Sequence, residues 1–169
     1  PNVDWINETF KNNGASDIYN LTFRGGGERL RYYTNVNLIS NLGFIAHPKE
    51  NSGYSTQNKY SKGSIRTNLD IDLTSTTKLE ANINGVLMEA SRPGLSSDDL
   101  WGKIYTIPAA AFPVKTEGGL WGGNTTWTGY YNPVALTEGR AYSKAHTRAL
   151  FADMTLKQDL SAVTDGLSV

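Results

Sequence analysis

Polar and apolar residues alternate most regularly over residues 60–73. The polar positions are Lys62, Ser64, Arg66, Asn68, Asp70 and Asp72, and the apolar parity carries Ile65, Thr67, Leu69, Ile71 and Leu73. Successive side chains of a strand point to opposite faces, so this period predicts a strand with one wet and one apolar face, not a helix. The run is longer than the roughly 5–6 residues usual in soluble proteins and suits a tilted membrane-spanning strand of about 9–11 residues.

Four further segments alternate in the same way and are predicted as strands, at residues 17–24, 30–39, 78–89 and 146–157. Short connections at 25–29 and 74–77 predict antiparallel hairpins. Opposing Phe23 to Tyr32 and Asp72 to Glu80 keeps the apolar parities on one face. Residues 167–169 are expected to begin a sixth strand. The predicted fold class is all-β, an antiparallel sheet that forms part of a membrane-spanning barrel.

Two long segments separate these hairpins, at residues 40–59 and 91–144, and both are predicted as exposed loops. Residues 1–13 are also assigned to a loop. Inside the second segment, Ser96 and the acidic pair Asp98 and Asp99 predict a helix start, and Pro108 closes the helix. Loops this long are uncommon in compact soluble domains, whereas the extracellular loops of outer-membrane barrels are often long.

Composition narrows the function classes. The 169 residues include 16 basic and 16 acidic side chains, so the zero net charge offers no global attraction to nucleic acid. No cysteine is present, which excludes disulfides and thiolate metal sites. No apolar run reaches the ~18 residues of a helical membrane span. The first residues lack the features of a signal peptide, so an exported protein would need a longer precursor.

Two groups of residues are candidates for ligand contact. On the wet face of the strands they are Lys62, Arg66, Asn68, Asp70, Asn82 and Asn84. In the long segment they are the aromatic residues Trp101, Trp121, Trp127, Tyr130 and Tyr131. Aromatic faces can stack on sugar rings, but such residues also pack within loops, against protein partners or at a membrane interface, and these alternatives stay open.

Catalytic and metal sites are not expected. Asp70, Asp72 and Glu80 fall on one wet face, and paired carboxylates can cleave a glycosidic bond. Solvated charges balanced by Lys62, Arg66 and Lys78 explain them better, because nothing supplies the burial that would shift a pKa. His47 and His146 lack a second metal ligand at useful spacing, and Asp98 and Asp99 fit a helix cap, so we expect no metal or other cofactor.

Several stretches together resemble one protein family. They are DWINETF, NLTFRGGGERLRYYTNVNL, YSKGSIRTNLDIDLTSTTKLEANINGVL, AAFPVK followed by LWGGN, YYNPVAL, and RALFADMTLKQDLSAVTDGLSV. In this order and spacing they are similar to the early barrel region of SusC-like TonB-dependent outer-membrane transporters. The resemblance extends over nearly the whole chain.

The resemblance implies a 22-strand barrel in the outer membrane of a Gram-negative bacterium, of which this chain would supply five or six strands without the N-terminal plug. It implies nutrient uptake rather than enzymatic chemistry: import of glycans or peptides, with a SusD-like lipoprotein and the TonB complex as partners and lipid around the barrel. The short connections would then lie in the periplasm and the long ones outside. A secreted carbohydrate-binding β-sandwich is the alternative, whereas a glycoside hydrolase would need a convincing carboxylate pair.

Overall fold

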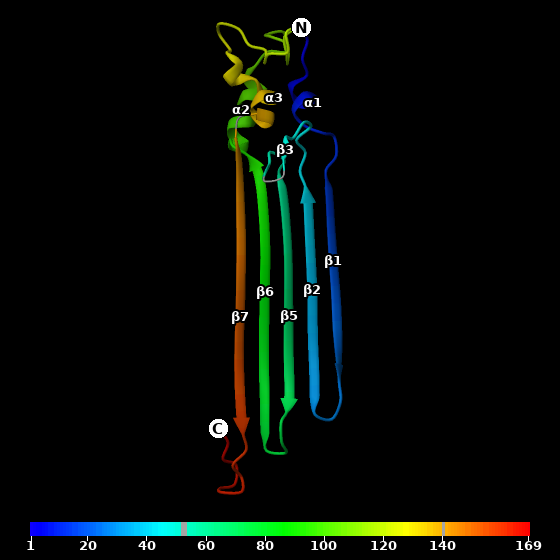
Figure 1. The fold of residues 1–169 in the computed structure, drawn as a ribbon, viewed down its shortest axis with the longest axis vertical. Helices are drawn as coiled ribbons and strands as arrows, with labels where there is room; N and C mark the ends of the chain where they lie inside the picture. Colours follow the sequence, from blue (N-terminus) through cyan, green and yellow to red (C-terminus); the bar gives the residue numbers. More distant parts are fainter. Residues whose placement is uncertain (52–53, 140) are drawn as a thin grey trace. The chain divides into compact units, whose positions relative to one another are not determined.

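The computed structural model describes residues 1–51, 54–139 and 141–169. Its main feature is a five-stranded sheet, ordered β1-β2-β5-β6-β7, in which each long strand pairs with its neighbour in sequence (Figure 1). The direction of the chain alternates from strand to strand, as in an antiparallel meander. The strands are β1 (Ala15–Gly26), β2 (Leu30–Leu42), β5 (Lys59–Asp72), β6 (Thr77–Pro93) and β7 (Tyr142–Gln158).

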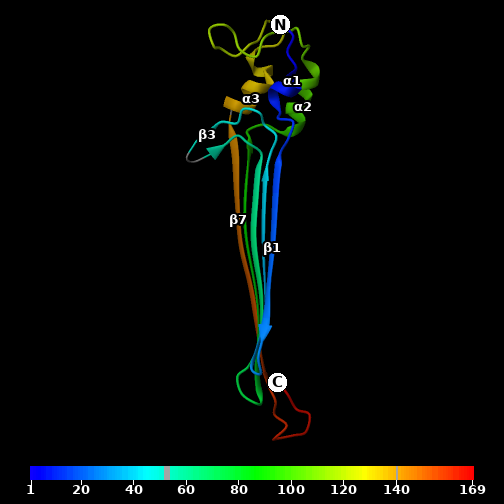
Figure 2. The same ribbon diagram turned by 90° about the vertical axis from the view of Figure 1, so that its right-hand side faces the viewer.

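The chain divides into two compact units. Unit 1 comprises Pro1–Ser16, Ser40–Tyr60 and Glu89–Ala145, and unit 2 comprises Asp17–Ile39, Ser61–Met88 and His146–Val169. Unit 2 therefore holds the central parts of all five long strands and the two tight turns, β1 to β2 and β5 to β6. Viewed from the side in Figure 2, these strands lie in a single layer.

The five predicted strands are confirmed; β5 has the predicted 14 residues, and the other four are longer than predicted, with 12 to 17 residues. The sixth is not a strand in the described residues: only an isolated bridge joins Asp159 to Ser168. The chain turns back at once because the Asp159 carboxylate accepts hydrogen bonds from Ser161, and Gly166 adopts a positive φ of 79°. The last residues therefore fold against the end of β7.

Both tight connections are confirmed. Gly27 N–H donates to the Leu30 carbonyl at 2.8 Å, and Thr74 N–H donates to the Thr77 carbonyl at 3.2 Å. The predicted registers need a correction, because the Tyr32 ring lies over Gly25, and Asp72 pairs with Lys78 rather than lying opposite Glu80. Both changes are consistent with a shift by two residues, which leaves the faces unchanged since side-chain parity repeats every two positions.

Unit 1 corrects the prediction of long exposed loops. Its segments contain β3 (Glu50–Asn51), β4 (Tyr54–Ser55), α2 (Ser97–Thr106), the 3₁₀ turn η1 (Gly129–Tyr131) and α3 (Pro133–Gly139). They share a core of buried side chains that comprises Trp5, Ile45, Leu100, Ile104, Ile107 and Phe112. A hydrophobic core holds these segments, which alternation along a strand cannot reveal.

Residues 1–13 are not simply a loop, because they contain the short helix α1 (Trp5–Thr9). The Asp4 carboxylate caps it by accepting hydrogen bonds from Ile6 N and Asn7 N at 3.1 and 3.2 Å. Trp5 is buried at 4% exposure and packs on Phe112 with ring centroids 5.1 Å apart. A helix of five residues is marginal alone, so its burial in the core stabilises it.

The helix predicted after Ser96 is confirmed as α2. The Ser96 hydroxyl accepts a hydrogen bond from Asp99 N at 3.1 Å, and Asp98 and Asp99 occupy the first turn, where the helix dipole favours negative charge. Leu100 and Ile104 form its buried face. In the part of the chain that the structure describes, none of the helices has the length and apolar character needed to cross a bilayer.

Candidate functional site

The apolar residues of unit 2 form one continuous surface, the apolar face. Its members include Tyr19, Leu21, Phe23, Leu30, Tyr32, Val36, Leu38, Ile65, Leu69, Ile71, Leu79, Ile83, Leu87, Leu150, Met154 and Leu156. Contacts between strands confirm the shared parity: the Thr34 and Thr67 hydroxyls lie 3.2 Å apart, and the backbone at Gly85 lies against Ile65 and Leu150. These contacts join β2, β5, β6 and β7 on one side of the sheet.

This face is exposed rather than covered. Leu87, Leu150 and Met154 are 60%, 73% and 75% exposed, and among the described residues of unit 2 only Ala81 of the apolar parity is a buried core residue. Soluble proteins rarely expose an apolar patch larger than a few hundred Å² unless it meets a partner or a membrane.

The apolar runs have a common length along their strands. They extend over residues 30–38 in β2 and 79–87 in β6. A third run extends over residues 65–73, from within β5 to the residue that follows it. Each run covers eight residue steps. At ~3.3 Å per residue, each run is about 26 Å long. At the end nearer the long connections, the next residue of the same parity is Ser40 in β2, Gly63 and then Ser61 in β5, and Glu89 in β6. The band is therefore bounded.

The opposite side of unit 2, the polar face, carries the wet-face candidates on two neighbouring strands. Lys62, Arg66, Asn68 and Asp70 lie on β5, and Asn82 and Asn84 lie on β6. Further along the sheet, the Asn35 amide donates to Asn20 Oδ1 at 2.7 Å and Thr22 Oγ1 at 3.0 Å. The alternation thus places the six candidates on the same surface.

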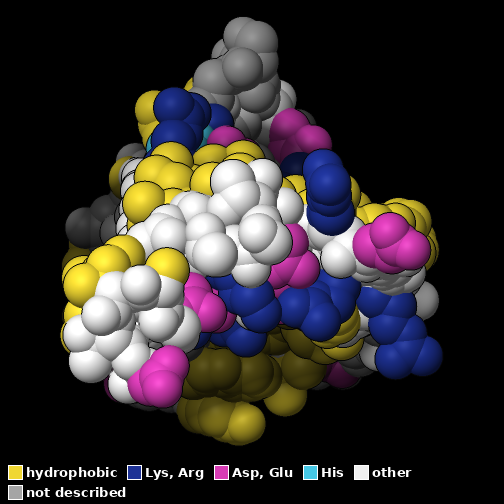
Figure 3. Space-filling model, turned by 90° about the horizontal axis from the view of Figure 1, so that it is seen from below, with side chains coloured by type: hydrophobic (Ala, Val, Ile, Leu, Met, Phe, Trp, Pro, Cys, Tyr) yellow, Lys and Arg dark blue, Asp and Glu magenta, His cyan; other side chains and the backbone are white. Residues whose placement is uncertain are grey.

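Each of the three carboxylates on the polar face forms an ion pair, as expected of solvated charges rather than of a catalytic pair. Asp72 pairs with Lys78 at 3.8 Å, Asp70 with Arg31 at 4.0 Å, and Glu80 with Lys157 at 2.6 Å. The predicted partner Lys78 is confirmed, but Arg31 and Lys157 replace the expected Lys62 and Arg66. Sequence reasoning missed both because they come from neighbouring strands. Viewed from the end with the tight turns, acidic and basic side chains lie beside one another (Figure 3).

The polar face also carries some large apolar side chains. Ile18 and Phe151 share the polar parity of β1 and β7, and they are 67% and 64% exposed. The two faces therefore differ in a specific way: the polar face mixes charges, amides and a few apolar groups, while the band on the apolar face contains almost no charge.

The five aromatic candidates all lie in unit 1, but their ring faces already have neighbours. Trp101 lies between Phe10 at 4.8 Å and Tyr105 at 5.6 Å. Lys115 lies 4.4 Å from the centroid of Trp121, and Trp127 packs against the core. These three tryptophans therefore fit the packing alternative better than direct stacking on a sugar.

Tyr130 and Tyr131 hold a lysine instead. Lys103 Nζ lies 4.5 Å from the Tyr130 ring centroid and 4.4 Å from that of Tyr131, so the cation of α2 contacts both rings of η1. Tyr105 was not among the predicted aromatic candidates, although its side chain is 74% exposed. It stands four residues after Trp101, a spacing that places both on one side of a helix.

Polar side chains organise the loops of unit 1. Gln57 is buried and hydrogen-bonds both the amide and the carbonyl of Ile45 at 3.0 Å. Asn132 is fully buried and donates to the carbonyls of Val114 and Gly122 at 2.9 and 3.2 Å. Each side-chain amide forms the hydrogen bonds to backbone groups that a neighbouring strand would form in a regular sheet.

Two carboxyl groups outside the long strands have shifted pKa values. Hydrogen bonds from Lys59 and then Ser55 hold the pKa of Glu50 below its ordinary value. The Ser161 hydroxyl and backbone N–H lower the pKa of Asp159 in the same way. Both shifts favour the charged form, so neither group is prepared to act as an acid at neutral pH. The described residues contain no cluster of three or more His, Cys, Asp or Glu side chains arranged to hold a metal ion.

Comparison with known proteins leaves the family open: no protein family and no curated protein matches the chain.

Proposed function

We propose that this chain is an arc of a membrane-spanning β-barrel that imports nutrients across a bacterial outer membrane. The observation that carries the proposal is the exposed apolar face, a band about 26 Å long along the strands at ~3.3 Å per residue, on a sheet whose opposite face is ion-paired. Outer-membrane barrels present an outward apolar band about 25 Å tall and a polar interior.

The two faces then meet two different media. Lipid covers the apolar face, so its side chains need no second protein layer, while water in the lumen solvates the ion pairs of the polar face. Backbone groups of the strands are satisfied by neighbouring strands, as a hydrocarbon environment requires. The edge strands β1 and β7 pair with further strands that complete the barrel.

The substrate side of the proposal rests on the resemblance to SusC-like TonB-dependent transporters. In this interpretation unit 1 belongs to the extracellular surface, where a SusD-like lipoprotein meets the barrel. Glycans or peptides pass along Lys62, Arg66, Asn68, Asp70, Asn82 and Asn84, and the TonB complex acts through a region outside this chain. No bond is made or broken.

The decisive experiment measures the polypeptide in the membrane of its source cell. We expect it in the detergent extract of the outer membrane, with an intact mass several times 18.5 kDa and a gel mobility that changes on heating. A polypeptide of 18.5 kDa that remains in the aqueous fraction would reject the barrel. That result would favour the secreted carbohydrate-binding β-sandwich, in which a second sheet covers the apolar face.

A further inference from the structure

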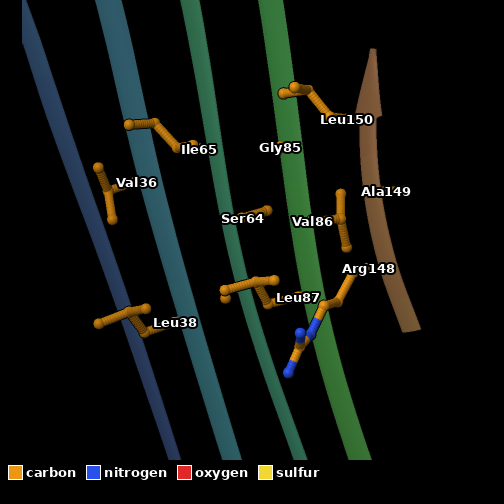
Figure 4. Close-up of a pocket in the computed structure, with 11 residues that line it drawn as sticks. Val36, Leu38, Ser64, Ile65, Gly85, Val86, Leu87, Arg148, Ala149 and Leu150 are labelled. Carbon is orange, nitrogen blue, oxygen red and sulfur yellow. The ribbon is translucent and has the colours of Figure 1, made fainter. Parts of the chain in front are cut away.

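The apolar face contains a groove at two glycines that lie on adjacent strands and have no side chain. Gly63 of β5 and Gly85 of β6 both occupy the apolar parity, and the groove between their larger neighbours has a volume of about 500 Å³. Its walls are Val36, Leu38, Ile65, Leu87 and Leu150 (Figure 4). A volume of this size lies within the range of small-ligand sites, roughly 300–1,000 Å³.

Arg148 is the charged side chain of this groove. It occupies the apolar parity of β7, directly before the apolar run Leu150, Ala152, Met154 and Leu156. Figure 4 shows it at the same end of the groove as Leu38 and Leu87, with Ile65 and Leu150 at the other end. Among the residues described by the structure, none forms a hydrogen bond or an ion pair with its guanidinium.

An unpaired guanidinium beside hydrocarbon side chains requires an anion or water. Arg148 lies one strand repeat beyond Leu150, where the apolar band ends, so in the proposed orientation its head is at the level of lipid headgroups. A guanidinium forms two parallel hydrogen bonds to a phosphate, whereas the groove beside it offers only apolar contacts. The guanidinium suits an anionic group and the groove suits a hydrocarbon chain, so one molecule that carries both would fill the site.

We propose that this groove binds a phosphate-headed membrane lipid, with one acyl chain over Gly63 and Gly85 and the phosphate on Arg148. The inference rests on the proposed function, because it needs the apolar face to lie in a bilayer. The absent side chains at the two glycines give the acyl chain its depth, and Arg148 binds the phosphate of the headgroup.

The test is native mass spectrometry of the complete detergent-extracted polypeptide, titrated with phosphatidylglycerol or with diacylglycerol of the same acyl chains, which lacks the phosphate. We expect a preference of about tenfold for phosphatidylglycerol, the size of one charge-assisted hydrogen bond. Arg148→Gln removes the preference, and Arg148→Lys retains part of it. Arg24→Gln is the matched control, because it removes the same charge from the polar face of β1 and leaves the preference intact.

A second variant tests the groove independently of the charge. A Cβ at Gly63 would meet only Leu38 at 3.5 Å, an ordinary contact, so Gly63→Leu fills the groove without displacing the backbone. We expect it to weaken both lipids about equally, and glycerol phosphate, which has no acyl chain, not to compete. Heat-modifiable mobility verifies that every variant folds.

Three results would rule out the proposed lipid site. They are equal binding of the two lipids to the unmodified protein, a preference that survives Arg148→Gln, and an equal loss in Arg24→Gln. In each case the polypeptide remains an integral membrane protein, so the proposed function stands. A polypeptide that stays in water without detergent overturns the proposed function and the lipid site together.

Discussion

Units 1 and 2 handle apolar side chains in opposite ways. In unit 1, Phe112 is 3% exposed and Ile45 is fully buried in a shared core, while in unit 2 Phe23 and Leu150 are 54% and 73% exposed. The difference is one of packing: unit 1 has a shared core of buried side chains, whereas unit 2 leaves most of its apolar face exposed, and under the proposed function lipid covers that face.

The largest test of this comparison removes one phenylalanine from each unit. Phe112→Ala leaves a cavity in the core, so we expect the free energy of unfolding of unit 1 to fall by about 3–5 kcal/mol. Phe23→Ala removes a half-exposed ring and should cost no more than about half of that. All four tryptophans lie in unit 1, so their fluorescence during urea unfolding measures the effect of Phe112→Ala, while the denaturant midpoint of the heat-modifiable folded form measures that of Phe23→Ala in unit 2. Equal losses of stability would mean that unit 2 has a core of its own.

A charge placed on either face of β7 distinguishes lipid from water. Met154 lies on the apolar face and Thr155 on the polar face, and both are exposed. If the apolar face meets lipid, Met154→Arg costs about 2–4 kcal/mol near the midplane, whereas Thr155→Arg has little effect. The measurement is the denaturant midpoint of the heat-modifiable folded form in detergent or lipid. Equal midpoints for the two variants would show that both faces are in water.

The buried amide of unit 1 sharpens the contrast further. Asn132→Ala leaves the carbonyls of Val114 and Gly122 without their donor, and we expect a loss of about 1–3 kcal/mol. Asn124 is the control, since it also bonds loop backbone but is exposed, so water replaces it in Asn124→Ala. Tryptophan fluorescence during urea unfolding should separate the two variants. A larger loss in Asn124→Ala would contradict the burial argument.

The smallest expected effect depends on pH. Hydrogen bonds from Lys59 and Ser55 lower the pKa of Glu50 below its ordinary 4.5, so the stabilisation is complete above that value and is lost as pH falls through the folded-state pKa. Hydrogen exchange at Tyr54 and Ser55 of β4 should therefore accelerate at acidic pH relative to more distant amides, after correction for the intrinsic rate. Glu50→Gln should abolish this acceleration. Persistence of the effect in the variant would assign it to another group.

The alternation along the chain was sufficient to predict the strands of unit 2 and their two faces. Residues 60–73 specify a strand because the period of two is a local property, set by how successive side chains point. The same rule placed Lys62, Arg66, Asn68 and Asp70 on one surface. The helix start at Ser96 was also predictable, because a cap depends on residues within one turn.

Only the tertiary structure decided what those surfaces contact. Arg31 and Lys157 pair with Asp70 and Glu80 because neighbouring strands bring them together, and the groove exists because Gly63 and Gly85 lie on adjacent strands. Likewise, the core of unit 1 gathers Trp5, Ile45 and Phe112 from segments far apart in sequence. Periodicity determines the direction of a side chain, but its partners depend on which segments the fold places side by side.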